Sequence, residues 1–117
     1  HSGRVLLVPD GGQDNTYTLP APIAGSMFRF VYAGGAADAT DAIIITPGNT
    51  NFYIGGITFL DTDGNAISSV FSNGSSNSSI QFNVPAGFDV TIMGLNTTNY
   101  QIFGNATSTT APAFADQ

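Results

Sequence analysis

The sequence predicts an all-β protein that folds as a single-domain antiparallel β-sandwich, jelly-roll-like, or as a barrel, with extended termini. Three observations support this class. Glu and Lys, two of the good helix formers, are absent from the 117 residues. Gly, Pro, Asn and Ser recur every few residues as breakers of regular structure. Between them lie short runs rich in Val, Ile, Phe, Tyr and Thr, at the spacing of about 8–12 residues typical of sandwiches and barrels.

Nine strands are predicted, and the apolar periodicity indicates which side of some of them is buried. In chain order they span residues 4–8, 16–19, 27–33, 42–46, 52–60, 66–72, 78–84, 88–93 and 100–104. Phe88, Val90 and Ile92 share one side of their strand, which predicts a buried face. The strands at 27–33 and 42–46 are apolar on both sides, so we expect each to be central in a sheet or covered by a partner.

The last thirteen residues differ from the rest of the chain. Residues 105–117 are mainly Thr, Ala and Pro, with Phe114 as their one large apolar side chain. We therefore divide the chain into a β-sandwich domain at 1–104 and an extended C-terminal tail at 105–117. Such a tail is too poor in apolar residues to fold alone. It is either frayed or an arm that docks on a neighbouring molecule through Phe114.

Composition argues against several classes of function. The formal charge of −6 disfavours nucleic acid and anionic membrane surfaces, since both bind clustered Lys and Arg. The chain has no Cys, Lys or Glu, and its single histidine is His1 at the terminus. Most of the Asp residues lie in or beside predicted turns, where Asp is common. We expect no enzymatic activity and no cofactor.

The run Asp61-Thr62-Asp63-Gly64-Asn65 resembles the start of a calcium loop, with oxygen ligands at alternate positions. Asp61, Asp63 and Asn65 are therefore weak candidate metal ligands. An EF-hand needs a Glu further along the chain, and this sequence has none. The favoured interpretation is a hairpin turn in which the Asp side chains accept hydrogen bonds from backbone N–H groups.

Apolar surface left over from strands with two apolar faces marks an interface, so we expect a homo-oligomer or a large partner. The candidate interface residues are Arg4, Arg29 and Phe114. Arg29 lies in the middle of a strand among aromatic residues. Either it faces solvent with its stem on Phe or Tyr, or it forms an ion pair with an Asp of another subunit.

Nearly the whole chain resembles a family of small virion proteins of tailed phages, especially marine and cyanobacterial ones. The resemblance is carried by GRVLLVPD at 3–10, NTYTLPAPIAG at 15–25, FRFVYAGGAADA at 28–39, NFYIGG at 51–56, GSSNSS at 74–79 and APAFADQ at 111–117. No single motif is diagnostic. The run Asn96-Thr97 departs from the pattern, in which a tryptophan follows the Asn.

The resemblance implies a capsid decoration (cement) protein. Such a protein binds the outer surface of the head shell and braces neighbouring major capsid proteins; the resemblance does not say which capsid sites are used. We expect a homotrimer, bound where capsid subunits meet near local threefold axes. The neutral Ser/Asn/Gly stretch at 72–79 suits an outward face of the virion, because it stays hydrated at marine salt, where charges more than about 5 Å apart are screened. It also avoids repulsion between many like-charged copies.

The alternative is a carbohydrate-binding or adhesion module, or a tail structural protein of the virion. In a sugar site, exposed aromatic rings would stack on the sugar while Asp and Asn donate or accept hydrogen bonds. The candidate rings are Tyr17, Tyr32, Tyr53 and Tyr100.

Overall fold

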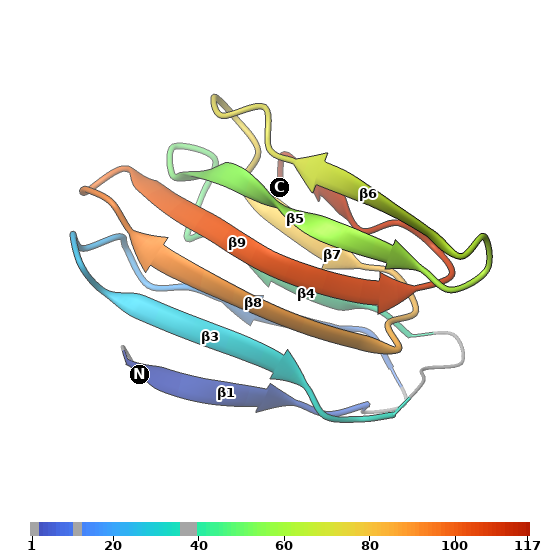
Figure 1. Ribbon diagram of the computed structural model, residues 1–117. Helices are drawn as coiled ribbons and strands as arrows, with labels where there is room; N and C mark the ends of the chain where they lie inside the picture. The colour runs from blue at the N-terminus through green and yellow to red at the C-terminus, as the bar shows by residue number, and fades with distance from the viewer. Residues whose placement is uncertain (1–2, 11–12, 36–39) are drawn as a thin grey trace.

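The computed structural model describes residues 3–10, 13–35 and 40–117. In these residues the chain forms two open β-sheets packed face to face, which confirms the β-sandwich and shows no closed barrel (Figure 1). The strands are β1 (Arg4–Val8), β2 (Asn15–Thr18), β3 (Met27–Tyr32), β4 (Ala42–Ile45), β5 (Phe52–Asp61), β6 (Ala66–Phe71), β7 (Ser79–Phe82), β8 (Gly87–Gly94), β9 (Asn99–Ser108) and β10 (Ala113–Ala115).

The two sheets are mixed, whereas the sequence predicts purely antiparallel ones. The larger sheet has the order β1-β3-β8-β9-β5-β6 and the smaller one β10-β7-β4-β2. The pairs β1–β3, β2–β4 and β5–β9 are parallel. The first two follow from the path of the chain, because β1, β2, β3 and β4 alternate between the sheets. Between the two members of each pair the chain forms one strand in the other sheet and turns back twice. The second member therefore runs in the same direction as the first.

The core lies between the inner faces of the sheets. Phe88, Val90 and Ile92 are buried, as their alternation predicts. Phe82 of β7 stacks on Phe88 of β8 with ring centroids 4.1 Å apart, so the two sheets meet through aromatic contact. Each such side chain stabilises the fold by about 1.5–3 kcal/mol through removal of apolar area from water.

Residues 105–117 complete the sandwich, so the separate tail predicted from the sequence is wrong as a structural unit. The boundary expected at 104 lies inside β9, which continues to Ser108. β10 then pairs with β7, and this places Phe114 beside Ile80. The ring of Phe114 packs edge-on against Tyr53, with centroids 6.0 Å apart. Ladder hydrogen bonds and one aromatic side chain hold the segment because β7 supplies the apolar surface that the segment itself lacks.

Candidate interaction face

The outer face of the six-stranded sheet carries large apolar side chains in contact with solvent. Side chains alternate across a strand, so a strand that buries every second residue presents the others on this face. Six exposed large hydrophobic residues lie there, and we call them the apolar face: Val5, Leu7, Met27, Ile67, Phe71 and Phe103. Phe71 is 70% exposed and Phe103 is 49% exposed. An exposed cluster of this kind is typical of a contact surface.

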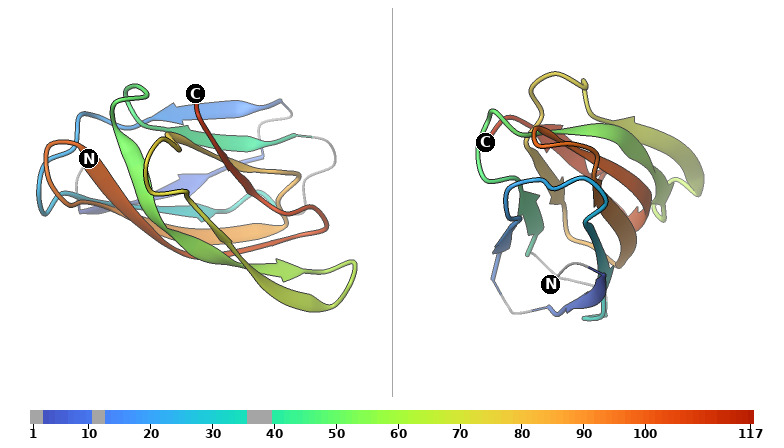
Figure 2. Two further views of the ribbon diagram at one scale, coloured as in Figure 1. Left: turned by 90° about the horizontal axis from the view of Figure 1, so that it is seen from above. Right: turned by 90° about the vertical axis from the view of Figure 1, so that its left-hand side faces the viewer.

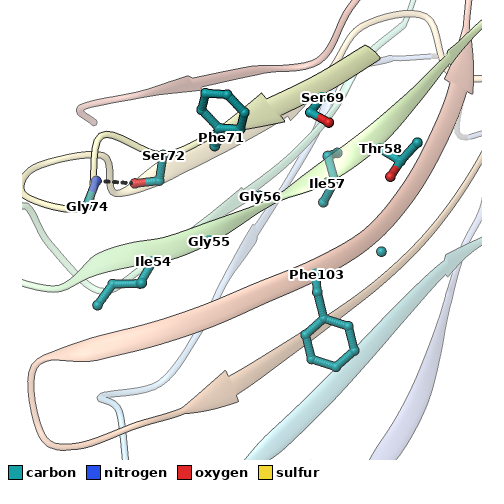
Figure 3. Close-up of a pocket in the computed structure, with 11 residues that line it drawn as sticks. Ile54, Gly55, Gly56, Ile57, Thr58, Ser69, Phe71, Ser72, Gly74 and Phe103 are labelled. Atoms are coloured by element: carbon teal, nitrogen blue, oxygen red, sulfur yellow. Dashed lines mark hydrogen bonds between the residues drawn. The ribbon is translucent and has the colours of Figure 1, made fainter. Parts of the chain in front are cut away.

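A groove of about 590 Å³ crosses the apolar face where the sheet has no side chain. Its floor includes Gly55 and Gly56 of β5, and Phe71 of β6 and Phe103 of β9 flank it on either side (Figure 3). A Cβ atom on Gly56 would collide with the carbonyl oxygen of Val70 and lie 2.8 Å from the Cα of Phe71. The close approach of β6 to β5 therefore requires glycine at this position, and the same glycine leaves the space between the two phenylalanine rings.

Phe103 stands between this groove and two further hollows. One hollow of about 310 Å³ is also lined by Val5 and Met27. The other, of about 290 Å³, is also lined by Arg29 and Asp89. The ring of Phe103 thus projects between three depressions. A protein partner of complementary shape can pack against such a surface.

Arg29 pairs with an Asp of its own chain rather than standing unpaired in solvent or pairing with an Asp of another subunit, the two alternatives left open by the sequence. On the outer face, Arg29 of β3 donates from Nε to Oδ1 of Asp89 on β8 at 2.8 Å, and from Nη2 to Oδ2. The hydrogen bonds from Arg29 lower the pKa of the Asp89 carboxyl, and the same pair raises the pKa of the guanidinium. Both side chains remain partly exposed. Their opposite charges cancel, so the pair adds no net charge to the apolar face.

The other two candidate interface residues lie elsewhere. Arg4 begins β1, and its side chain lies outside the described part of the structure. Phe114 is half-buried and packs on the core of its own domain, which contradicts the interpretation as an arm docked on a neighbour. Of the three candidates, Arg29 alone has a described side chain on the apolar face.

The run at 61–65 is the hairpin turn between β5 and β6. Oδ1 of Asp61 accepts hydrogen bonds from the backbone N–H groups of Asp63, at 2.9 Å, and Gly64, at 3.1 Å. Asn65 takes the left-handed conformation, with φ of 50°, that the turn requires. The hydrogen bonds agree with the turn interpretation favoured from the sequence. Within the described residues, no three acidic or histidine side chains gather closely enough to hold a metal ion.

The Ser/Asn/Gly loop connects the two sheets, and it is closed by hydrogen bonds among its own residues. Oδ1 of Asn73 accepts from the backbone N–H groups of Ser75, Ser76 and Asn77. Oδ1 of Asn77 accepts in return from the N–H of Asn73, at 2.9 Å. Side-chain amides and hydroxyls therefore replace a ladder of backbone bonds, which explains why the loop needs no charged residue.

Two of the four tyrosines are fully buried and the other two are only partly exposed, so the sugar-binding alternative loses two of its four candidate rings. Tyr53 and Tyr100 are fully buried, and Tyr17 and Tyr32 pack against the core. The hydroxyl of Tyr53 donates to the carbonyl of Ile44 at 2.9 Å and thereby joins the two sheets. Burial raises the pKa of Tyr53 well above its ordinary range.

Phe103, Phe71 and Gly56 are the residues of this face that sequence reasoning missed. In the stretch 100–104, Tyr100 and Ile102 lie on one side of the strand, and Gln101 and Phe103 lie on the other, so each side carries a large apolar residue. Periodicity alone could not decide which side is outward. The remaining signal was the glycine pair in the middle of a predicted strand, which often marks a close backbone approach.

Comparison with protein-family models, curated proteins and solved structures finds no match to this chain. Among the described residues there is no helix that is long and apolar enough to cross a membrane. The fold and the face together define a class: a β-sandwich with one apolar outer sheet face.

Proposed function

We propose that this protein is a phage capsid decoration (cement) protein. It binds the outer surface of the head shell and stabilises the contacts between neighbouring major capsid proteins. The observation that carries the proposal is the apolar face, whose six exposed side chains lie on one side of the six-stranded sheet. The resemblance to small virion proteins supports the same conclusion.

The apolar face has the features of a protein-binding surface. Its large side chains belong to β1, β3, β9 and β6, so the contact surface spans the whole width of the sheet. Phe103 lies near the middle with hollows around it, the position where binding energy usually concentrates in an interface. The ion pair of Arg29 with Asp89 leaves no net charge at the centre, so burial under a partner does not strand a single charge there.

The remaining surface suits exposure on a virion. The turns at both ends of the sandwich are rich in Ser, Thr, Asn and Gly. Their side chains bond to neighbouring backbone groups, as at Asn73 and at Asn96, whose Oδ1 accepts from two N–H groups. The hydroxyl and amide side chains carry no charge, so their hydration is insensitive to ionic strength, and the Asp residues of the loops give this surface its net negative charge.

The test is the copy number and position of the protein in purified virions, followed by the thermal stability of heads. We expect many copies spread evenly over the head, and we expect stripped heads to release DNA at a lower temperature than complete heads. Adding the protein back should restore the release temperature. Stripped heads that are as heat-stable as complete ones would refute the bracing role, and a few copies at the tail would support the tail structural or adhesion alternative.

A further inference from the structure

The edge strand β6 has a free hydrogen-bonding side. β6 lies at the end of the six-stranded sheet and pairs with β5 alone among the described strands. It stands at the margin of the sandwich (Figure 2), and β10 is the strand of the smaller sheet that lies near it. All of its residues except Val70 are exposed. The outer side of β6 is therefore a row of backbone donors and acceptors open to a further strand.

The ladder with β5 fixes which residues point to the free side. The N–H of Ser72, directly after β6, donates to the carbonyl of Gly55 at 3.0 Å. In an antiparallel pair the residues that bond to a given neighbour alternate, so Val70 and Ser68 also bond toward β5. Ile67, Ser69 and Phe71 consequently direct their N–H and C=O groups to the free edge, and their side chains lie on the outer face.

β6 lacks the devices that usually protect an edge. Its sequence, AISSVF, has no charged residue and no proline. Its six residues pair one to one with residues 56–61, so the strand carries no bulge that would twist the edge away. Natural sheets place Lys, Pro or a bulge at such edges to prevent pairing with another chain. The absence of all three in β6 favours a strand partner.

We propose that β6 pairs antiparallel with β6 of a second copy of this chain, with the twofold axis at Ser69. In this register Ile67 lies opposite Phe71 of the second copy, and Ser69 lies opposite Ser69. Apolar residues thus meet apolar residues and hydroxyl meets hydroxyl, on one continuous outer face. The strand is self-complementary, which is what an isologous contact requires.

Charge placement selects the antiparallel arrangement. The hairpin turn at 62–65 contains the exposed carboxylate of Asp63. In the antiparallel pair this turn comes beside loop 73–77 of the second copy, which has no charged residue of its own and whose Asn77 donates from Nδ2 to the carboxylate of Asp116 at 3.2 Å. A parallel pair would place Asp63 beside Asp63 and oppose two like charges. The two copies also present their apolar faces on the same side, so a dimer can bind one surface with both.

This contact goes beyond the proposed function and replaces the expected homotrimer. It concerns the free protein in solution and does not depend on what the apolar face binds. If the protein does not bind heads, the β6 contact between two copies is unaffected. If the β6 contact is absent, the proposed binding to the shell is unaffected.

The test is cross-linking through single cysteines, since the chain has none of its own. Directly opposed residues of a bonded antiparallel pair have Cα atoms about 5.5 Å apart, within the range for a disulfide. Ser69→Cys should therefore oxidise to a linked dimer. Ser68→Cys is the matched control, because Ser68 is exposed on the same strand but lies roughly 8 Å from its symmetry mate in this register.

We expect Ser69→Cys to cross-link at least about tenfold faster than Ser68→Cys, because the pairing raises the effective concentration of the thiols. We also expect the unmodified protein to shift from the mass of one chain to that of two as its concentration rises. Equal cross-linking rates would overturn the proposal. So would a mass of one chain at every concentration, or a mass of three chains.

Discussion

The two outer faces of the sandwich are built from the same kind of alternating strand, yet they present different chemistry. The six-stranded sheet exposes the apolar face. The four-stranded sheet presents mainly small or polar residues: Thr16, Thr18, Gln81, Ala113 and Ala115, with Ile43 and Ile45 half-buried among them. None of the exposed large hydrophobic residues of the described chain lies on this second face.

The difference shows that exposure of apolar residues is not a general property of this chain. On the four-stranded sheet, Gln81 donates from Nε2 to Asp41 at 2.7 Å and to Asn83 at 3.0 Å, so its polar groups form a network in contact with water. On the six-stranded sheet, the charged groups of Arg29 and Asp89 are paired, and the large side chains around them have no such network. One face suits water and the other suits a partner.

The largest expected effect is on binding to the shell. Phe103→Asp places a carboxylate at the centre of the apolar face and should weaken binding to stripped heads about 100-fold, or about 2.7 kcal/mol. The matched control is Thr16→Asp, which adds the same charge to the exposed part of the other face and should bind as the unmodified protein does. Titration of each variant onto heads measures the difference. Equal losses in the two variants would mean that the faces do not differ in function.

The groove on the apolar face depends on Gly56, where any side chain would meet the backbone of β6. Gly56→Ala should lower the free energy of unfolding by about 1–3 kcal/mol, because the added Cβ meets the backbone of β6. Gly48→Ala is the control, since a Cβ there meets nothing within 4 Å. Denaturant unfolding of both variants tests the effect. A loss at Gly56 no larger than that at Gly48 would show that β6 moves away from β5 without cost.

The hydroxyl of Tyr53 on one sheet donates a hydrogen bond to the other sheet, so its removal should lower the stability of the whole sandwich. Tyr53→Phe leaves the carbonyl of Ile44 without this donor and should cost about 1–2 kcal/mol of unfolding free energy. Burial raises the pKa of Tyr53, so the unfolded chain ionises first, and stability is lost as the pH rises above the ordinary value of 10.0. The variant should therefore lose less stability at high pH than the unmodified protein. An identical decline in both would contradict this role.

The smallest effect concerns the ion pair within the apolar face. Arg29 lowers the pKa of Asp89, so the pair stabilises the fold above the ordinary Asp value of 3.8 and this contribution is lost as the pH falls through the lowered pKa. Asp89→Asn should be slightly less stable than the unmodified protein at neutral pH, and the gap should close in acid. Chemical unfolding at a series of acidic pH values measures the gap. A constant difference would show that charge plays no part.

The sequence could predict what depends on a single strand. The periodicity of Phe88, Val90 and Ile92 identified their buried face, and the first strand was predicted with the bounds that the structure shows. The turn at Asp61 was also predictable, because an Asp that accepts from the N–H groups two and three residues ahead is a local arrangement. The strand at 113–115 was not predictable, since its stability comes from β7, more than thirty residues away.

The candidate site was less predictable than the fold. Arg29 was noticed as an unusual residue, but its partner Asp89 is sixty residues away in sequence. Phe71 and Phe103 are exposed although phenylalanine is among the residues most often buried, so residue type alone did not single them out.

By itself, the sequence determined that this protein is all-β, as a sandwich or a barrel, with turns rich in hydroxyl, amide and Asp side chains, because strand propensity, breakers and turn chemistry act over a few residues. Only the tertiary structure decided which side of β9 faces water, that Tyr53 and Tyr100 are buried and that β6 has an open edge. These features depend on which strands become neighbours. Where both sides of a strand are apolar, the packing of the second sheet alone determines which side it covers, and the side left uncovered here is the apolar face.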